Sequence, residues 1–220
     1  MRDQIRNLVS EVENESKQNA YLENQLLRSR INPHFLHNTL AGICEQARTS
    51  GQEELGNTIQ ALNSLLYHNL GKNKITTLRD EISAVEDYVL LQRRVQDFIY
   101  KKDIQVQDDI LSMELPSFVL QPLVENSIIH SKSENLEIEL HVRVQNGLLL
   151  VELEDNGQGI APDQQEEINN RLHQCSAQGM GIGLAYVNSS LKYFFAHRAS
   201  LTVQNALGHS GTLVTITIIL

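Results

Sequence analysis

Cysteine is rare in the sequence, and its rarity argues against two kinds of protein. The chain has two cysteines in 220 residues, Cys44 and Cys175, which lie far apart and form no CxxC pair. Disulfide-stapled secreted domains contain several cysteines, and structural zinc sites group them at short spacing. We therefore expect neither a disulfide framework nor a zinc site, and the cysteine usage fits a reducing cytoplasm.

Long apolar runs and an excess of positive charge are also lacking. No stretch of 18 or more apolar residues occurs, so the sequence predicts no membrane span. Met1 opens a polar, charged segment, and we expect no signal peptide there. The formal net charge of −9 argues against general binding of nucleic acid, which requires a basic surface.

The composition that remains is typical of a soluble globular protein with one large domain or two small ones, at 41% hydrophobic and 20% charged residues. Residues 1–30 carry a heptad seam with a polar middle, which predicts a coiled coil; a single amphipathic surface helix is the alternative. The seam positions are Ile5, Leu8, Val12, Glu15, Asn19, Leu22 and Leu26.

Residues 31–97 are expected to be helical. Pro33 interrupts the first helix, and turns at 50–51 and 71–74 separate further helices at about 33–50 and 53–70. Thr77 with Asp80 resembles an N-cap pair that opens a fourth helix. The pattern predicts a helical hairpin that dimerises into a four-helix bundle.

Residues 98–220 are expected to form an α+β sandwich, with helices on one face of a largely antiparallel sheet. The pair Asn146-Gly147 predicts a hairpin turn between alternating strands at 138–144 and 148–154. The other expected elements are a strand at 104–110, helices at 116–130, 162–174 and 181–195, and a closing hairpin of 201–204 with 212–219.

Two glycine-rich segments indicate a nucleotide site, DNGQGI at 155–160 and GMGIGL at 179–184. Glycine lets the backbone approach a ligand closely, and the second segment runs directly into an apolar, helix-like stretch. A glycine-rich loop that leads into a helix N-terminus favours phosphate, because free N–H groups and the helix dipole both attract an anion.

Two further segments carry candidate functional side chains. In QPLVENSIIH, at 121–130, Asn126 and His130 share a helix face, and the oxygens of Glu125 and Asn126 suit Mg²⁺; ordinary helix capping is the alternative. In RINPHFLHNTL, at 30–40, His34 is a candidate nucleophile, and a structural or exposed histidine is the alternative. His34 and His37 provide two potential metal ligands, and a metal site requires at least a third.

In this order INPHFLHN, QPLVENSIIH, DNGQGI and GMGIGL resemble sensor histidine kinases of the LytS/YesM type, over about residues 25–220. The ATP-binding half of that family belongs to the GHKL superfamily. The resemblance implies a helical hairpin and coiled-coil dimerisation region followed by a GHKL (Bergerat-type) α/β sandwich. The expected domains are a signalling helix at 1–30, a phosphotransfer region at 31–97 and an ATP-binding domain at 98–220.

The resemblance also implies roles for individual residues. His34 is the phosphoacceptor, and Asn38 is a candidate for a phosphatase role. Asn126 coordinates Mg²⁺, with Glu125 close by as a candidate base, and Asp155 hydrogen-bonds the adenine amino group. The other implied ATP contacts are His130, Gly157, Gly159, Ile160, Gly179, Gly181, Ile182, Gly183 and Leu184, under a mobile lid formed by residues 161–178.

Two departures from the family pattern bear on the chemistry. Phe35 stands where many histidine kinases place an acid, which leaves Glu125 as our hypothesis for the proton acceptor. Ile129 stands where a lysine is common, so Lys132 or Arg171 is expected to supply the missing positive charge.

The resemblance implies ATP-dependent autophosphorylation on His34 and transfer of the phosphoryl group to an aspartate of a response-regulator receiver domain. It further implies a homodimer that forms the cytoplasmic portion of a membrane-bound sensor, whose sensor region lies outside this chain. Nucleic acid is not an expected partner. The alternatives are a degenerate kinase, or a GHKL ATPase, that acts as a nucleotide-gated dimeric scaffold.

Overall fold

The computed structural model describes residues 33–70, 75–131, 133, 135–174, 182–208 and 210–220. The chain divides into two compact units, residues 1–70 and 71–220. The coiled coil expected at 1–30 lies outside the described residues.

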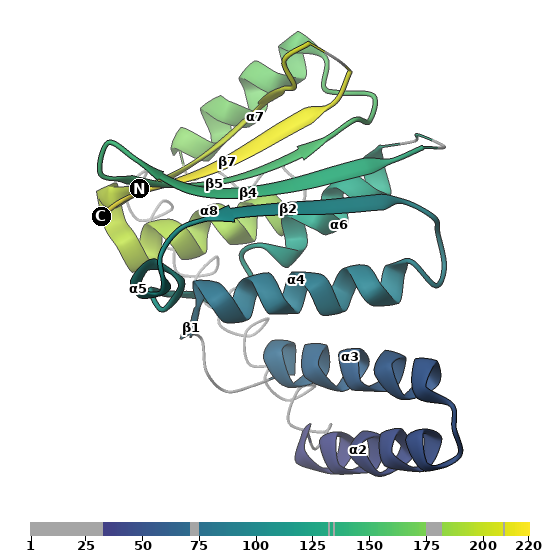
Figure 1. Ribbon diagram of the computed structural model, residues 1–220. Helices are drawn as coiled ribbons and strands as arrows, with labels where there is room; N and C mark the ends of the chain where they lie inside the picture. The colour runs from purple at the N-terminus through teal and green to yellow at the C-terminus, as the bar shows by residue number, and fades with distance from the viewer. Residues whose placement is uncertain (1–32, 71–74, 132, 134, 175–181, 209) are drawn as a thin grey trace, which may run out of the picture. The chain divides into compact units, whose positions relative to one another are not determined.

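The first unit contains a hairpin of two helices, α2 (Pro33–Thr49) and α3 (Glu53–Leu70), which pack side by side (Figure 1). Gly51 has a φ of +74° in the turn, and its N–H donates to the carbonyl of Arg48. A glycine in this left-handed conformation ends a helix without steric cost. Small side chains then allow close packing, and the Cys44 thiol donates to the Gly56 carbonyl at 3.3 Å. The expected hairpin is confirmed.

The second unit is built on a five-stranded sheet of order β2-β4-β5-β7-β6, in which β2 runs parallel to β4 and the other pairs are antiparallel. Its strands are β2 (Ile99–Gln105), β4 (Glu137–Gln145), β5 (Leu148–Asp155), β6 (Ala199–Asn205) and β7 (Thr212–Ile219). Two short strands, β1 (Ile75–Thr77) and β3 (Glu114–Pro116), pair separately. Asn146 and Gly147 both have positive φ between β4 and β5, so the predicted hairpin turn is confirmed.

Helices α4 (Leu78–Gln92), α6 (Gln121–His130) and α8 (Ile182–Phe195) cover one face of this sheet (Figure 1). Alternate residues of β4 and β5 point into the core between the sheet and these helices, and Leu140, Val142 and Leu149 are fully buried. Helix α7 (Pro162–Gln174) packs against β6, and two shorter helices, α5 (Asp108–Leu111) and the 3-10 turn at Ala196–Arg198, complete the unit. The expected α+β class is confirmed.

Two of the predicted elements have the wrong bounds. The strand predicted at 104–110 is β2, at Ile99–Gln105, and α5 follows it. Most of β2 is exposed because it is an edge strand, so it lacks the apolar alternation that reveals β4. The helix predicted from Pro116 begins only at Gln121, because Phe118 adopts a φ of +66° that no helix tolerates.

Helix α4 belongs to the second unit in space, whereas the sequence placed it with the phosphotransfer region at 31–97. Its buried side chains, Leu78, Ile82, Val85 and Val89, join the core under the sheet. Thr77 caps the helix as predicted, since its hydroxyl accepts from the Asp80 N–H at 3.2 Å. The compact second unit therefore begins ahead of α4, at residue 71.

Candidate nucleotide-binding site

Asp155 is a buried carboxylate at the end of the core-facing series of β5. Leu149, Val151 and Leu153 precede it on the same face, and Asp155 is only 6% exposed. Three donors hold its side chain: the Ser127 hydroxyl at 2.8 Å from Oδ2, and the backbone N–H groups of Gly157 and Thr212 at 2.9 and 3.3 Å from Oδ1. A carboxylate has about four acceptor positions, so Asp155 retains capacity for one further donor.

Gly157 places no side chain beside that carboxylate. A Cβ atom at this position would lie 2.8 Å from the Ser131 Cα and 2.9 Å from Asp155 Oδ1. Any side chain there would collide with the backbone and cover the acceptor oxygen. Asp155 could therefore accept one further N–H donor.

The loop after β5 is held by side chains from the far edge of the sheet. Asn205, at the end of β6, accepts from the Ile160 N–H at 2.7 Å and donates to the Ile160 carbonyl at 2.9 Å. Gly159 precedes this contact with a φ of +72°, and a Cβ there would lie 2.9 Å from Asn205 Oδ1. The Ser210 hydroxyl donates to the Gly157 carbonyl at 2.8 Å. This bracing fixes the course of the loop beside Asp155.

Sequence reasoning missed four of these residues: Ser127, Asn205, Ser210 and Thr212. Ser127 directly follows Asn126, which the sequence identified as a candidate ligand. The position of Asn126 could therefore have pointed to Ser127. The other three come from β6, β7 and the turn between them, and only the β5–β7 pairing brings them to the end of β5.

Asn126 lies where α6 meets the first turn of α8. A Cβ on Gly183 would lie 3.3 Å from the Pro122 Cβ and 3.7 Å from the Asn126 Nδ2, so glycine permits this close approach. Leu184 is partly buried against the core. The predicted ligands Gly179 and Gly181 lie outside the described residues, and so does the side chain of Ile182.

Glu125 lies on a different face of α6 from Asn126, as consecutive helical residues do. Its Oε1 accepts from the Gln121 amide at 2.8 Å, and it lies near Tyr88 of α4. Burial, and secondly the charge of Glu125, raise the pKa of Tyr88 to about 12. His130 is exposed at the last residue of α6, one turn beyond Asn126. The structure therefore directs Glu125 towards α4 and Asn126 towards α8.

The lid expected at 161–178 contains a docked helix. Asn169 of α7 donates to the Val203 carbonyl and accepts from the Val203 N–H, at 2.6 and 3.0 Å, and Leu172 is 1% exposed. These contacts place α7 against β6 in this structure, and residues 175–178 of the expected lid lie outside the described residues. Arg171 pairs with Glu167 on the same helix, and Lys132 lies outside the described residues.

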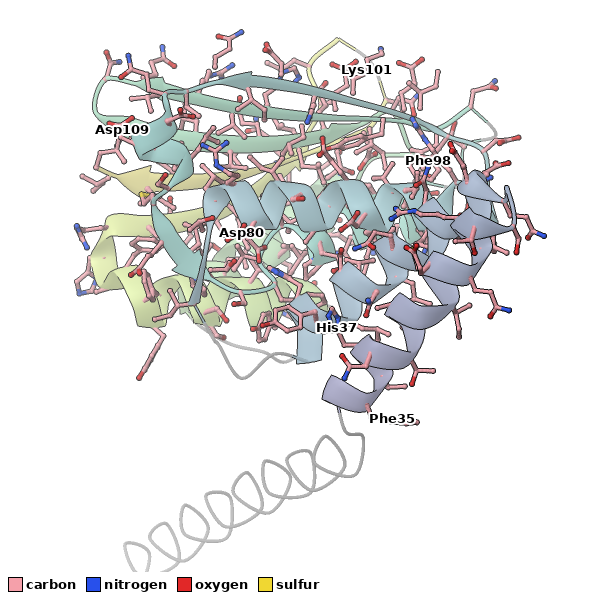
Figure 2. The ribbon with its side chains drawn as sticks, turned by 60° about the horizontal axis from the view of Figure 1, so that its bottom comes forward. Phe35, His37, Asp80, Phe98, Lys101 and Asp109 are labelled. Carbon is pink, nitrogen blue, oxygen red and sulfur yellow. The ribbon has the colours of Figure 1, made fainter. Side chains whose placement is uncertain are left out.

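The predicted phosphoacceptor lies in the first turn of α2. Pro33 begins the helix and His34 follows, with its side chain outside the described part of the chain. Phe35 is 64% exposed and points outward (Figure 2), whereas His37 Nδ1 lies 3.0 Å from Asn63 Oδ1 on α3. Asn63 Nδ2 also donates to the His37 carbonyl at 3.3 Å. His37 is thus a structural contact of the hairpin.

The described residues include no group of three or more His, Cys, Asp or Glu side chains arranged to hold a metal ion. Among the helices that the structure describes, none combines the length and apolar character needed to cross a membrane.

Two family models match the chain: the histidine kinase family over residues 22–97, and the histidine kinase-, DNA gyrase B- and HSP90-like ATPase family over residues 114–220. The sensor protein LytS of Bacillus cereus is 29% identical over 96% of this chain and 36% of its own length. The sensor histidine kinase YesM of Bacillus subtilis is 29% identical over 94% of this chain and 35% of its own length. The chain therefore spans about a third of the length of these relatives.

A likeness to a solved structure concerns the fold alone. The nucleotide-free catalytic domain of the histidine kinase ThkA superposes with a TM-score of 0.51 at 16% identity, over 66% of this chain and 93% of that domain. The family matches cover both units, and this likeness supports the sheet-and-helix architecture of the second.

Proposed function

Because the chain belongs to the histidine kinase family of the LytS and YesM type, we propose that it binds ATP in its second unit and phosphorylates its own His34. The observation that carries the proposal is the buried Asp155 carboxylate, which is held by three donors and has no side chain beside it at Gly157. A buried charged acceptor in an apolar series stabilises the fold less than an apolar residue would, so its presence favours a role in binding.

Asp155 accepts the adenine amino group in this proposal, and Gly157, Gly159 and Ile160 shape the wall beside the base. Asn126 holds Mg²⁺ through its amide oxygen, a ligand type that this cation accepts; the ion neutralises charge on the phosphate oxygens. The amide lies within 4 Å of the position that a Cβ on Gly183 would take, at the helix end where phosphate is favoured. His130 and the segment 179–184 complete the phosphate contacts.

The transfer step places a nitrogen of His34 in line with the γ-phosphorus. A nitrogen–phosphorus bond forms as the bond from phosphorus to the bridging oxygen breaks, and ADP leaves with the electron pair. Glu125 takes the imidazole proton, and Asn38, one turn after His34, orients water when the phosphoryl group is hydrolysed instead. Positioning and electrostatic stabilisation supply most of the rate in such transfers.

The partners follow from the same proposal. The hairpin exposes large apolar side chains that it cannot bury itself, among them Phe35, Leu55 and Tyr67, and this supports a homodimer through a four-helix bundle. A response-regulator receiver domain accepts the phosphoryl group on an aspartate. The chain is the cytoplasmic part of a membrane sensor, with a sensor region outside the 220 residues and no role for nucleic acid.

Incubation with γ-labelled radioactive ATP tests the proposal. The wild-type chain should gain label that is labile to acid and stable to alkali, and His34→Gln should gain none. His37→Gln is the matched control on the same helix, because its contact with Asn63 is structural, and it should retain label. Labelling of His34→Gln would refute the assignment of His34. If the wild-type chain bound ATP but gained no label, a scaffold would be favoured. If it hydrolysed ATP steadily without gaining label, an ATPase would be favoured.

A further inference from the structure

Helix α4 contains a carboxylate that is almost completely buried and that lies outside the residues assigned to ATP. Glu81 is 1% exposed. Its Oε1 accepts from the Phe118 N–H at 2.7 Å, and its Oε2 accepts from the N–H groups of Val119 and Leu120 at 2.8 and 3.0 Å. A buried carboxylate is costly unless it is compensated, and here three consecutive backbone donors compensate it.

These donors belong to the segment 117–120, which leads directly into α6. Phe118 has a φ of +66°, a strained conformation for a bulky residue, and it persists only where neighbouring contacts impose it. Leu120 is the N-cap of α6 and makes no side-chain cap hydrogen bond of its own. Glu81 supplies a negatively charged acceptor at this helix N-terminus from a different helix. It therefore fixes where α6 begins.

The same segment contacts α8. The Tyr186 hydroxyl donates to the Ser117 carbonyl at 3.1 Å, and the rings of Phe118 and Tyr186 meet edge to face with centroids 5.9 Å apart. Segment 117–120 thus joins three helices: α4 through Glu81, α6 through the chain itself, and α8 through Tyr186. Asn126 and Gly183 lie on the two helices that this junction holds together.

We propose that Glu81 is a positioning residue for the nucleotide site, which holds α6 against α8 so that Asn126 stands opposite Gly183. The inference rests on the proposed function, because it requires that ATP bind between these helices. It concerns the phosphate and Mg²⁺ side of the site. The adenine acceptor, Asp155, lies on β5, and two of its three donors, the N–H groups of Gly157 and Thr212, lie outside α6; only the third, the Ser127 hydroxyl, comes from α6.

The test compares Glu81→Gln with the wild-type chain by calorimetric binding of ATP with Mg²⁺ and of adenosine. A glutamine keeps the size of the side chain but turns an NH₂ group towards at least one of the three backbone donors. We expect affinity for ATP with Mg²⁺ to fall about ten-fold, as for lost outer-shell partners of metal ligands. Affinity for adenosine should fall by a clearly smaller factor, about two-fold or less, because two of the three donors to Asp155 do not come from α6.

Glu86→Gln is the matched control, since this carboxylate lies on the same helix but pairs with Lys102 of β2. It should leave both affinities unchanged. A merely structural role of Glu81 would weaken ATP and adenosine equally, and this result, or unchanged ATP binding in Glu81→Gln, would overturn the inference.

Tyr186→Phe provides an independent variant should Glu81→Gln fail to fold. It removes only the hydroxyl that donates to Ser117, and it should shift the two affinities in the same direction by a smaller factor. Unchanged ATP affinity in Tyr186→Phe would then overturn the inference. Failure of the wild-type chain to bind ATP would instead refute the proposed function, so the two failures are distinguishable.

Discussion

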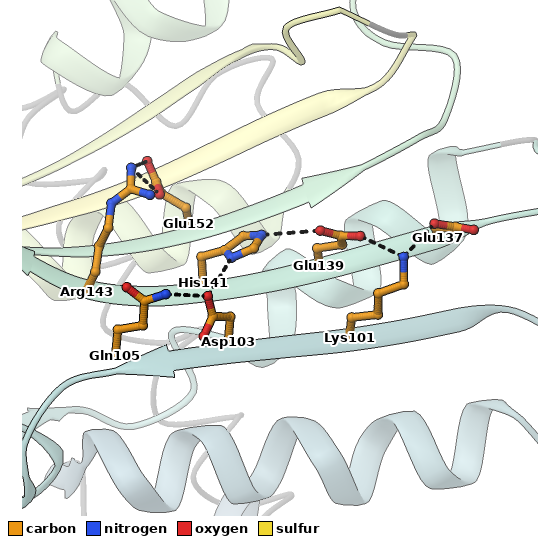
Figure 3. Close-up of polar contacts among 8 residues, drawn as sticks. All are labelled: Lys101, Asp103, Gln105, Glu137, Glu139, His141, Arg143 and Glu152. Carbon is orange, nitrogen blue, oxygen red and sulfur yellow. Dashed lines mark hydrogen bonds and ion pairs between the residues drawn. The ribbon is translucent and has the colours of Figure 1, made fainter.

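The two faces of the five-stranded sheet present opposite chemistry from the same strands. On β4, Ile138 and Leu140 are at most 1% exposed beneath the helices. Their neighbours Glu139 and His141 stand on the open face, where Lys101 bridges Glu137 and Glu139 (Figure 3). Burial of apolar area stabilises a fold far more than exposed ion pairs do, so stability should come from the helix-covered face.

Asp155 is the one charged residue in the buried series of β5. It continues the buried series of β5 but carries a charge, whereas the charged residues of the open face meet solvent. In the proposed function, the carboxylate on the covered face contacts the nucleotide, and the carboxylates on the open face have no such role.

The largest effect should come from truncation of the covered face. Leu140→Ala removes a side chain that is 1% exposed and leaves a cavity among close-packed neighbours. We expect the free energy of unfolding to fall by about 2–5 kcal/mol, measured by urea denaturation. Val144→Ala, at the 41% exposed end of the same strand, should cost about 0.5 kcal/mol or less. Val144 lies on the same face as Leu140 but at its exposed end, so equal losses in the two variants would contradict the assignment of stability to the buried part of this face.

The second effect should come from the charge on the covered face. Asp155→Asn keeps the shape but presents an NH₂ group to at least one of the existing donors, Ser127, Gly157 or Thr212. We expect a loss of about 1–3 kcal/mol in the free energy of unfolding and a fall in ATP affinity of at least about ten-fold, measured by calorimetry. The unpaired donors account for the first change and the missing adenine contact for the second.

Glu152→Gln gives the matched control for Asp155→Asn. Glu152 lies on the same strand but on the open face, where it pairs with Arg143 at 2.8 Å. ATP affinity should be unchanged in this variant. A comparable loss of ATP binding in both variants would show that the face of the strand does not decide function.

The sequence was sufficient where a local pattern determines the structure. Alternation along residues 138–144 predicted β4 and its buried face, and Asn146-Gly147 predicted the turn because only a few residue types accept two consecutive positive φ values. The Thr77 cap was predictable for the same reason, since it depends on a hydrogen bond across three residues. The glycines of segment 155–160 singled out the stretch that contains Asp155, and the resemblance supplied the role expected of that residue.

Contacts between distant segments could not be predicted in this way. The hydrogen bonds from segment 117–120 to Glu81 span 37 to 39 residues, and Asn205 reaches Ile160 across 45 residues. No local spacing in the sequence encodes such partners, and they can be identified only once the strand order is known. The edge strand β2 was misplaced for a related reason, because only Tyr100 and Ile104 of this strand are partly buried against the core and the resulting alternation is weak.

The smallest effect should come from Lys101→Met on the open face. Hydrogen bonding from Lys101 lowers the pKa of Glu139, and hydrogen bonds to Glu139 and Glu137 raise the pKa of Lys101. A lowered acid pKa stabilises the fold above the ordinary glutamate value of about 4.3, and a raised lysine pKa does so below about 10.4. The wild-type advantage should therefore span this window and vanish as pH falls through the lowered pKa of Glu139.

Thermal unfolding of the wild-type and Lys101→Met chains from about pH 3 to pH 8 measures this difference. The advantage should also shrink as salt is added, because both partners are exposed to screening ions. If the stability difference persisted at the lowest pH, it would come from packing of the lysine stem against the sheet and not from the lysine charge. The open face would then contribute to stability by the same means as the covered one, and the contrast between the two faces would fail.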